Sequence, residues 1–218
     1  MILNSETAAI IAEKLLQIKA IKLNVEKPFT WASGLRSPIY CDNRITLSFH
    51  ELRTYIRQQL VKAVQEHFEG VDVIAGVATA GIPQGVLVAE ALGLPFVYVR
   101  SQKKSHGLTN QIEGRINSGQ SVVVVEDLVS TGKSSLAAVD ALRDAGAVVK
   151  GMVAIFTYGL QVADANFTEK NCKLITLSDY DHLIDLAVAA DYVPQKDKFA
   201  LMEWRQNPRE WSNKFENK

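Results

Sequence analysis

Two adjacent carboxylates, Glu126 and Asp127, follow four consecutive valines at positions 122–125. Such a run predicts a parallel strand that is buried on both faces and ends at the two acids. A turn of small and hydroxyl residues comes next, followed by an expected helix over residues 135–145. Ligands of an open α/β sheet bind beyond the carboxyl ends of its strands, and a helix N-terminus suits a phosphate. Acids that accept hydrogen bonds from sugar hydroxyls beside such a helix predict a phosphorylated sugar as the ligand.

The same segment permits two other interpretations. Gly132, Lys133 and Ser134 have the order found at the end of a Walker A loop. That motif requires a glycine at position 127, where this chain has an aspartate whose charge would repel the phosphates. We therefore exclude a P-loop. The simpler alternative is a strand–turn–helix whose acids only cap the helix, and two acids followed by hydroxyls and a glycine make it less favoured.

Length and composition restrict the class of protein. The 218 residues suffice for one α/β domain, 1–218, with a sizeable core. The 24 basic and 24 acidic residues balance, which argues against a nucleic-acid surface. No apolar run approaches membrane-spanning length, and no signal peptide is visible. Cys41 and Cys172 share no metal-ligand spacing, so we expect reduced thiols and a cytoplasmic protein that binds neither nucleic acid nor membrane.

Strand and helix patterns alternate along the chain. Helices are expected over residues 5–21, from a capping box of Ser48 and Glu51 to about residue 68, and over 81–92. Strands are expected over residues 71–76, 95–100, 121–126, 148–157 and 173–178. The tail from residue 179 is expected to be helical, with breaks at Pro194 and Pro208. This order predicts an α/β fold whose mostly parallel central sheet carries helices on both faces.

The connection over residues 101–119 is polar and longer than an ordinary connection, which predicts a functional loop. It carries Lys103, Lys104 and His106, and Arg100 stands directly before it. Cations held in place there would stabilise the charge that develops on a departing polyanion. The alternative is a solvated basic loop, which these residues alone would favour.

The segment from Val122 to Ser135 resembles the phosphoribosyl-diphosphate (PRPP) binding motif of the type I phosphoribosyltransferases. The resemblance implies that Glu126 and Asp127 hold the ribose 2- and 3-hydroxyls and that the turn after them holds the 5-phosphate. The PRPP-binding residues that it implies are Glu126, Asp127, Leu128, Val129, Ser130, Thr131, Gly132, Lys133, Ser134, Arg100, Lys104, His106, Thr79 and Ala80.

The sequence RSQKKSHG, followed by Ile112-Glu113-Gly114, resembles the catalytic loop of the orotate phosphoribosyltransferases. Many members carry a lysine directly after the arginine, where this chain has Ser101, and Lys103 supplies that charge from a shifted position. The catalytic residues that this resemblance implies are Lys104, His106, Arg100, Asp127 and Lys103. The sequence GVATAGIP at 76–83 matches the family's pyrophosphate loop, with Ala80 in place of the lysine of some members. The contacts there would come from the backbone and from Thr79.

The sequences FTWASG and SPIYCDNR resemble the N-terminal hood of the same family, which covers the pyrimidine, and place a hood over about residues 1–45. Orotate is a flat ring with a carboxylate, and our candidates for binding it are Ser130, Arg44 and Tyr158. For Arg44, pairing with Asp42 is nearly as favoured, and for Tyr158 a place in the core is more favoured. Some members carry a lysine where this chain has Ala32, so base recognition is where the resemblance is weakest.

These resemblances together imply a type I phosphoribosyltransferase fold with a small N-terminal hood. The implied activity transfers ribose 5-phosphate from PRPP to orotate, in pyrimidine biosynthesis. They also imply Mg2+ bound mainly through substrate oxygens, with no dedicated protein site, and a homodimer whose loops reach the neighbouring site. Two alternatives stay open. One is a purine phosphoribosyltransferase, against which the hood and the loop argue. The other is a non-catalytic regulator that senses PRPP, which should carry an additional DNA-binding element and a basic surface.

Overall fold

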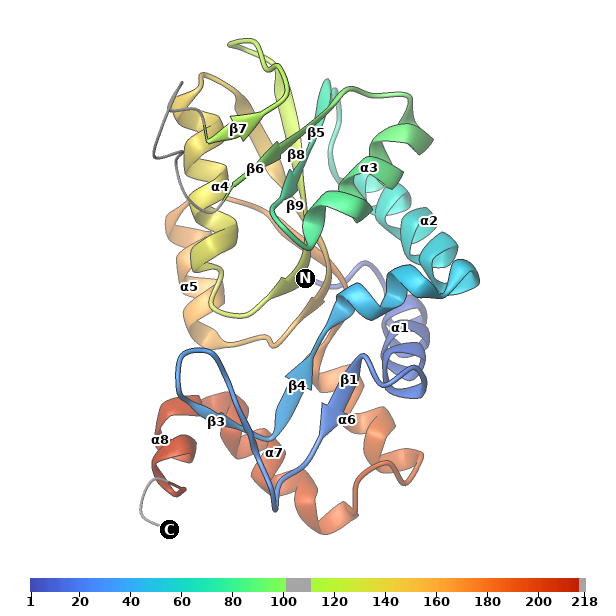
Figure 1. Cartoon of the computed structure of the whole chain (residues 1–218), viewed down its shortest axis with the longest axis vertical. Helices are drawn as coiled ribbons and strands as arrows, with labels where there is room; N and C mark the ends of the chain where they lie inside the picture. Colours follow the sequence, from blue (N-terminus) through green and yellow to red (C-terminus); the bar gives the residue numbers. More distant parts are fainter. Residues whose placement is uncertain (101–110, 216–218) are drawn as a thin grey trace.

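The structure is a computed structural model that describes residues 1–100 and 111–215, and its centre is a six-stranded sheet (Figure 1). The strand order is β10-β9-β8-β5-β6-β7, and every neighbouring pair is parallel except β6 and β7. The strands are β5 (Val73–Val77), β6 (Phe96–Val99), β7 (Ile112–Glu113), β8 (Ser121–Val129), β9 (Val148–Thr157) and β10 (Leu174–Asp179). The predicted mostly parallel sheet is thus confirmed.

The valines of β8 divide between two cores, one on each face of the sheet. Val122 and Val124 pack with α4 (Lys133–Asp144) and α5 (Gln161–Glu169). Val123 and Val125 pack with α2 (His50–His67) and α3 (Gly81–Leu92) on the other face. All four side chains are fully buried, because successive residues of a strand point to opposite faces and both faces are covered. Figure 1 shows the two pairs of helices on opposite sides of the sheet.

The order of the strands reverses between β5 and β8. The chain leaves β5 for β6 on one side and later returns to the other side of β5 as β8. The connections that follow β5 and β8 therefore diverge at the carboxyl edge, which is where ligands of such sheets bind. The pairing of β8 with β5 ends at Val125, while its pairing with β9 continues to Val129. Glu126 and Asp127 therefore lie within β8, just beyond its last residue paired with β5, whereas the sequence predicted that the strand ends at the acids.

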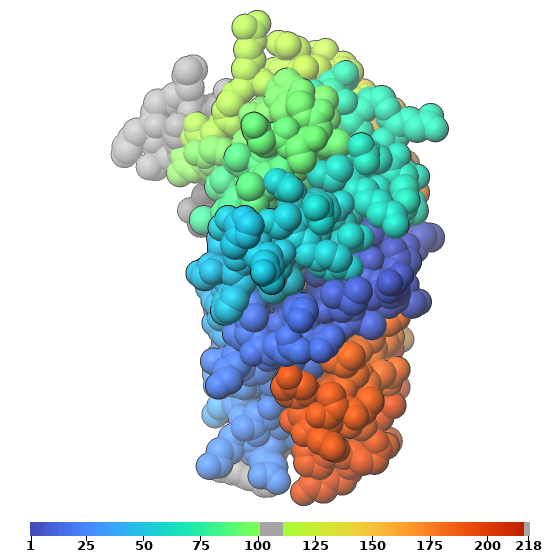
Figure 2. Space-filling model, turned by 90° about the vertical axis from the view of Figure 1, so that its right-hand side faces the viewer, coloured from blue at the N-terminus to red at the C-terminus, as the bar shows by residue number. Residues whose placement is uncertain are grey.

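The hood consists of two small antiparallel sheets and a 3-10 helix at one end of the molecule (Figure 1). Its elements are β1 (Ile21–Leu23) with β4 (Ile39–Cys41), β2 (Phe29–Thr30) with β3 (Arg36–Ser37), and the 3-10 helix Asn43–Ser48. The C-terminal helices α6 (Tyr180–Ala189), α7 (Lys198–Gln206) and α8 (Pro208–Asn213) lie beside these sheets, and Figure 2 shows the two ends of the chain sharing one half of the molecule. The main-chain N–H of Arg36 donates a hydrogen bond to the Ser212 hydroxyl over 2.9 Å. The sequence assigned the hood largely to residues 1–45. In the structure, the C-terminal helices contact it as well.

Several boundaries differ from the prediction. Helix α1 is Ser5–Gln17, shorter than predicted, because β1 begins at Ile21. The capping box of Ser48 and Glu51 was wrong: Ser48 ends the 3-10 helix, and the N-cap of α2 is Phe49, which makes no side-chain capping bond. The breaks at the two prolines are confirmed, since Pro194 precedes the 3-10 helix Gln195–Asp197 and Pro208 begins α8. Among the described residues, no helix is both long and apolar enough to cross a bilayer.

Candidate active site

Glu126 and Asp127 occupy different environments although they are neighbours in β8. Glu126 is almost completely buried, and its Oε2 accepts a 2.9 Å hydrogen bond from the hydroxyl of Ser135 on α4. Its Oε1 accepts a 3.0 Å hydrogen bond from the main-chain N–H of Asp127. Asp127 is half-buried and lies close enough to Arg44 of the hood for the guanidinium charge to affect its ionisation. One acid is therefore fixed to the core, and the other lies where the hood and the sheet meet.

Burial changes the ionisation of both acids. It raises the pKa of the Glu126 carboxyl well above its usual range, and the charge of Asp127 raises that pKa further. Burial also raises the pKa of Asp127, while its hydrogen bond with Glu126 and the charge of Arg44 oppose that shift. Because Glu126 is the more deeply buried of the two, it keeps its proton to the higher pH. The pair is thus suited to accept one or two positively polarised groups, such as sugar hydroxyls.

The turn after β8 leads into α4 through a glycine in the left-handed region. Gly132 has φ 76° and is the N-cap of α4, with no side-chain capping bond. A Cβ added to Gly132 would lie 2.7 Å from the ring of Phe167 on α5, so a larger residue does not fit. Asn166 of α5 donates a 2.9 Å hydrogen bond to the carbonyl of Thr131 and fixes the turn from behind. Thr131 and Ser134, which are exposed, flank this helix N-terminus, and such an arrangement suits a phosphate.

A second turn, residues 78–80, follows β5 and lies against the acids. The N–H of Ala78 donates to the carbonyl of Val99, and Thr79 is exposed. A Cβ added to Gly81, the first residue of α3, would lie 2.5 Å from the carbonyl oxygen of Val125 and 3.4 Å from the Cα of Glu126. This close approach of α3 to β8 requires glycine. The predicted pyrophosphate loop and the predicted ribose acids are therefore adjacent in space.

The hood reaches the acids through its 3-10 helix. The side-chain amide of Asn43, which is 1% exposed, donates a 2.7 Å hydrogen bond to the main-chain carbonyl of Asp127. Arg44 is exposed, and its guanidinium binds both carboxylate oxygens of Asp42 at 2.7 and 2.9 Å. This pairing lowers the pKa of Asp42, chiefly through the hydrogen bond from Arg44. The structure thus contains the Arg44–Asp42 pair of the alternative interpretation and also places Arg44 near Asp127.

Tyr158 follows β9 and lies in an aromatic cluster. It is 3% exposed, stacks on Trp31 of the hood at a ring separation of 5.3 Å, and meets Trp204 of α7 edge-on. Burial raises the pKa of its phenol well above the usual range. This environment agrees with the alternative interpretation of a core aromatic. The cluster joins the hood, β9 and the C-terminal helices.

Arg100 follows β6 directly, one strand beyond β5. Its guanidinium lies 3.5 Å from the carboxylate of Glu113 on β7, and its main-chain N–H donates to the carbonyl of Gln111. Gln111 in turn donates a side-chain hydrogen bond to the carbonyl of Arg100 over 2.8 Å. The structure therefore joins the residues that flank the predicted catalytic loop. Lys103, Lys104 and His106 lie outside the described residues.

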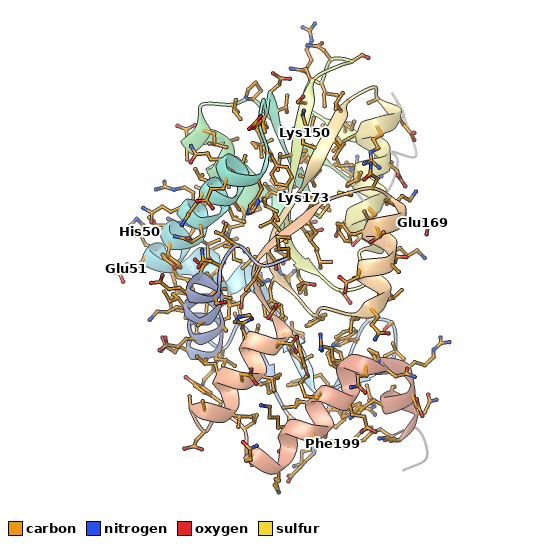
Figure 3. All side chains as sticks on the ribbon, turned by 180° about the vertical axis from the view of Figure 1, so that it is seen from behind. His50, Glu51, Lys150, Glu169, Lys173 and Phe199 are labelled. Atoms are coloured by element: carbon orange, nitrogen blue, oxygen red, sulfur yellow. The ribbon has the colours of Figure 1, made fainter. Side chains whose placement is uncertain are left out.

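A hollow of about 470 Å³ lies beside the turn that leads into α4, where it is lined in part by Thr131, Lys133 and Asn166. Within residues 1–100 and 111–215, no group of three or more His, Cys, Asp or Glu side chains is placed to hold a metal ion. A surface hollow of about 700 Å³ lies elsewhere, between α1 and the start of α2, where it is lined in part by His50 and Glu51 (Figure 3). The chemistry-bearing residues lie instead at the carboxyl edge of the sheet.

The sequence prediction missed the residues that support the site. Ser135, Asn166 and Asn43 each make one hydrogen bond that fixes an acid or the phosphate turn. Ser135 carried a weak signal as a hydroxyl in the first turn of a helix that follows two acids. Asn43 carried none, because its partner is 84 positions away in the sequence.

This fold and site define a phosphoribosyltransferase. Residues 50–190 match the phosphoribosyl transferase domain family. The orotate phosphoribosyltransferase of Listeria innocua is 54% identical over 201 residues, which are 92% of this chain and 96% of that protein. The orotate phosphoribosyltransferase of Bacteroides fragilis is 54% identical over 202 residues, 93% of this chain and 95% of that protein.

A solved structure agrees with these matches. The orotate phosphoribosyltransferase from Aeropyrum pernix superimposes with a TM-score of 0.72 at 26% identity, over 84% of this chain and 99% of that one. The UMP synthase of Leishmania donovani has the same fold, with a TM-score of 0.75 at 23% identity. The superposition includes 91% of this chain but only 42% of that protein. The chain belongs to the orotate phosphoribosyltransferases of the type I phosphoribosyltransferase family.

Proposed function

We propose that this chain transfers the ribose 5-phosphate group of PRPP to N1 of orotate, giving orotidine 5-monophosphate and pyrophosphate. The bond between C1 of the ribose and the pyrophosphate oxygen breaks, a bond from C1 to N1 of orotate forms, and the proton on N1 is released with the pyrophosphate. The observation that supports this function best is the adjacency of three features at the switch between β5 and β8. These features are the acids Glu126 and Asp127, the turn that leads into α4, and the turn of residues 78–80.

These three features correspond in their chemistry to the three parts of PRPP. Glu126 and Asp127 accept hydrogen bonds from the ribose hydroxyls. The backbone N–H groups and hydroxyls of residues 130–134 bind the 5-phosphate at the N-terminus of α4. Thr79 and the backbone of Ala80 bind the pyrophosphate beside the acids.

The reaction passes through a transition state in which the ribose carries positive charge and the pyrophosphate gains negative charge. Asp127 supports the ribose electrostatically, while Arg100, Lys103, Lys104 and His106 stabilise the departing pyrophosphate. Positively charged groups that interact with this charge only as the bond breaks stabilise the transition state more than the ground state. They therefore lower the activation barrier.

Orotate binds between the hood and the carboxyl ends of β8 and β9. Ser130 offers a hydroxyl to the ring, and Arg44 turns from Asp42 to the orotate carboxylate. Tyr158 forms the wall behind the ring through the aromatic cluster rather than covering it.

Mg2+ fits this site as a partner of the substrate. The half-buried carboxylate of Asp127 at the edge of the site is a hard oxygen donor, and oxygen atoms of PRPP supply most of the ligands. The ion neutralises pyrophosphate charge when bound. The active form is a homodimer in which the loop of one subunit serves the site of the other.

The test is an absorbance assay with a panel of bases. Orotate should be consumed when PRPP and Mg2+ are both present, and a chelator should abolish the reaction. Uracil, hypoxanthine and adenine serve as the competing acceptors. Equal or faster turnover of a purine would overturn the base assignment, and PRPP binding without turnover of any base would indicate a regulator.

A further inference from the structure

We propose that Asn43 is a positioning residue that holds the ribose-binding strand end through the main-chain carbonyl of Asp127. The amide Nδ2 of Asn43 lies 2.7 Å from that carbonyl oxygen, across 84 positions of sequence. This inference rests on the proposed role of Asp127 toward the ribose. Asn43 itself touches no substrate in the proposed function.

The surroundings of Asn43 fix the orientation of its amide. A main-chain carbonyl only accepts hydrogen bonds, so the atom that faces Asp127 is the NH2 group. The amide oxygen then faces Cys41, whose thiol donates to it over 3.3 Å. Both ends of the amide are therefore satisfied in one orientation, and flipping the amide would lose the bond to Asp127 and leave only a weak N–H···S contact with Cys41.

A second set of buried groups holds Asn43 from the other side. The hydroxyl of Thr46 donates a 2.6 Å hydrogen bond to the main-chain carbonyl of Asn43. The same hydroxyl accepts a longer bond, 3.5 Å, from the amide of Gln84. Asn43, Thr46 and Gln84 are at most 2% exposed, so water does not compete for these bonds.

The chain of contacts links the two halves of the proposed PRPP site. Gln84 lies in the first turn of α3, directly after the turn that binds pyrophosphate. Asp127 lies in β8, beyond the last residue paired with β5. At this point β8 no longer has β5 beside it, and the 3-10 helix of the hood supplies a hydrogen bond to its backbone instead. The hood is thereby tied to the ribose acid and, through Gln84, to the helix behind the pyrophosphate turn.

Loss of this tie predicts a defect at one site rather than a general loss of the fold. In Asn43→Ala the carbonyl of Asp127 loses its partner, and the carboxylate can leave the position that the ribose requires. We expect kcat/KM for PRPP to fall by roughly tenfold, as for removal of one buried hydrogen bond. The KM for orotate should change much less.

The experiment compares five single variants, Asp127→Asn among them, and one double variant by steady-state kinetics and thermal melting. Asn4→Ala is the matched control: the same substitution removes a 2.8 Å bond to the Thr7 N–H at the N-cap of α1. It should lower the melting temperature without changing kcat/KM. Thr46→Val removes the supporting hydroxyl and should behave like a weaker Asn43→Ala. Thr46→Ser keeps the hydroxyl and should restore most of the activity that Thr46→Val loses.

The double variant Asn43→Ala/Asp127→Asn separates positioning from simple destabilisation. If Asn43 acts through Asp127, its loss should have little further effect once the carboxylate is gone. If the fold-losses in kcat/KM of the two single variants multiply in the double variant, the inference is overturned. Equal losses of kcat/KM in Asn4→Ala and Asn43→Ala would also overturn it. If Asn43→Ala fails to fold, the Thr46 pair decides: equal activity of Thr46→Val and Thr46→Ser overturns it. If Asp127→Asn alone were fully active, the proposed ribose role would fail instead.

Discussion

The hydroxyl of Ser135 and the carboxylate of Glu126 are joined by a 2.9 Å hydrogen bond inside the protein, between α4 and β8. Both side chains are at most 5% exposed. One hydrogen bond from a hydroxyl and one from the Asp127 N–H are modest compensation for a buried charge. The pKa of Glu126 is accordingly raised, with burial as the main cause. Holding this carboxyl group in the interior therefore lowers the stability of the fold.

The first prediction concerns Glu126→Gln and its dependence on pH. The folded chain keeps a proton on Glu126 at pH values where the unfolded chain, with a Glu pKa of about 4.3, has lost it. Folding therefore takes up a proton in this window, and the stability of the wild type falls as pH rises above about 4.3. Glutamine cannot ionise, its amide oxygen can accept the bond from the Asp127 N–H, and its NH2 group can donate to the hydroxyl oxygen of Ser135. The melting temperature of the variant minus that of the wild type should be at least about 3 °C larger at pH 7.5 than at pH 4.

Glu169→Gln provides the control for this prediction, because Glu169 is an exposed carboxylate on the outer side of α5 (Figure 3). Its melting difference should change much less between the two pH values than that of Glu126→Gln, because solvent screens an exposed charge. A Glu126→Gln difference that changes no more with pH than this control would show that Glu126 folds without a raised pKa.

The second prediction concerns the glycine of the phosphate turn. Gly132→Ala should raise the KM for PRPP by at least about tenfold, because both the positive φ and the 2.7 Å approach to Phe167 force the turn to move. Gly70→Ala is the control, since Gly70 also has a positive φ of 62° but open space around its Cβ position. Both variants should lose stability through backbone strain. Only Gly132→Ala should lose affinity for PRPP, and the double variant Gly132→Ala/Phe167→Ala should recover part of it.

An unchanged KM in Gly132→Ala would mean that the turn tolerates displacement and that the 5-phosphate binds elsewhere. A double variant no better than Gly132→Ala would assign the defect to the backbone conformation alone.

The elements that the sequence predicted well are those with a clear apolar pattern. The valines of β8 reflect burial on both faces of the sheet, the apolar stripe of α2 reflects burial of one face of the helix, and both elements were found with small shifts in their ends. An alternating order of strands and helices implies a doubly wound sheet, and such a sheet contains a point where the strand order reverses. It does not show that this point lies between β5 and β8. The position of this point determines which turns become adjacent, and strand order is a tertiary property that local periodicity does not encode.

The elements that the prediction missed depend on contacts between distant segments. Strands β1 and β7 have three and two residues, too few for any periodic pattern. The capping box at Ser48 failed because the preceding residues form a 3-10 helix held by Asn43 and Thr46. The contribution of α7 and α8 to the hood arises from Trp204 and Ser212, whose partners lie near residue 31 and residue 36. Such contacts are visible only once the chain has folded.

The third prediction separates the two interpretations of Arg44. If Arg44 binds the orotate carboxylate, Arg44→Ala should raise the KM for orotate by at least about tenfold, as for loss of a charge-assisted bond, with little change in the KM for PRPP. If Arg44 serves only the exposed pair with Asp42, its loss should cost no more than about 1 kcal/mol of stability. Steady-state kinetics with each substrate varied in turn distinguishes these results.

Arg36→Ala is the matched control, because Arg36 is another exposed arginine of the hood whose side chain binds the hydroxyl of Thr30. It should leave both KM values unchanged. Equal KM values for orotate in Arg44→Ala and in the wild type would remove Arg44 from the base site.

The last prediction tests whether the loop of one subunit serves the site of its partner. Lys104→Ala should disable the loop, and Asp127→Asn should disable the ribose site. If the sites are shared, a mixed dimer of these two variants contains one site with both parts intact, formed by Asp127 of the first variant and Lys104 of the second. Random reassortment makes about half of the dimers mixed, so activity should return to roughly a quarter of the wild-type value. The two variants are unfolded, mixed and refolded together, with each refolded alone as the control. If the loop serves its own chain, neither site of the mixed dimer is complete, so absence of recovery despite demonstrated subunit exchange would leave an enzyme whose loop acts within one subunit.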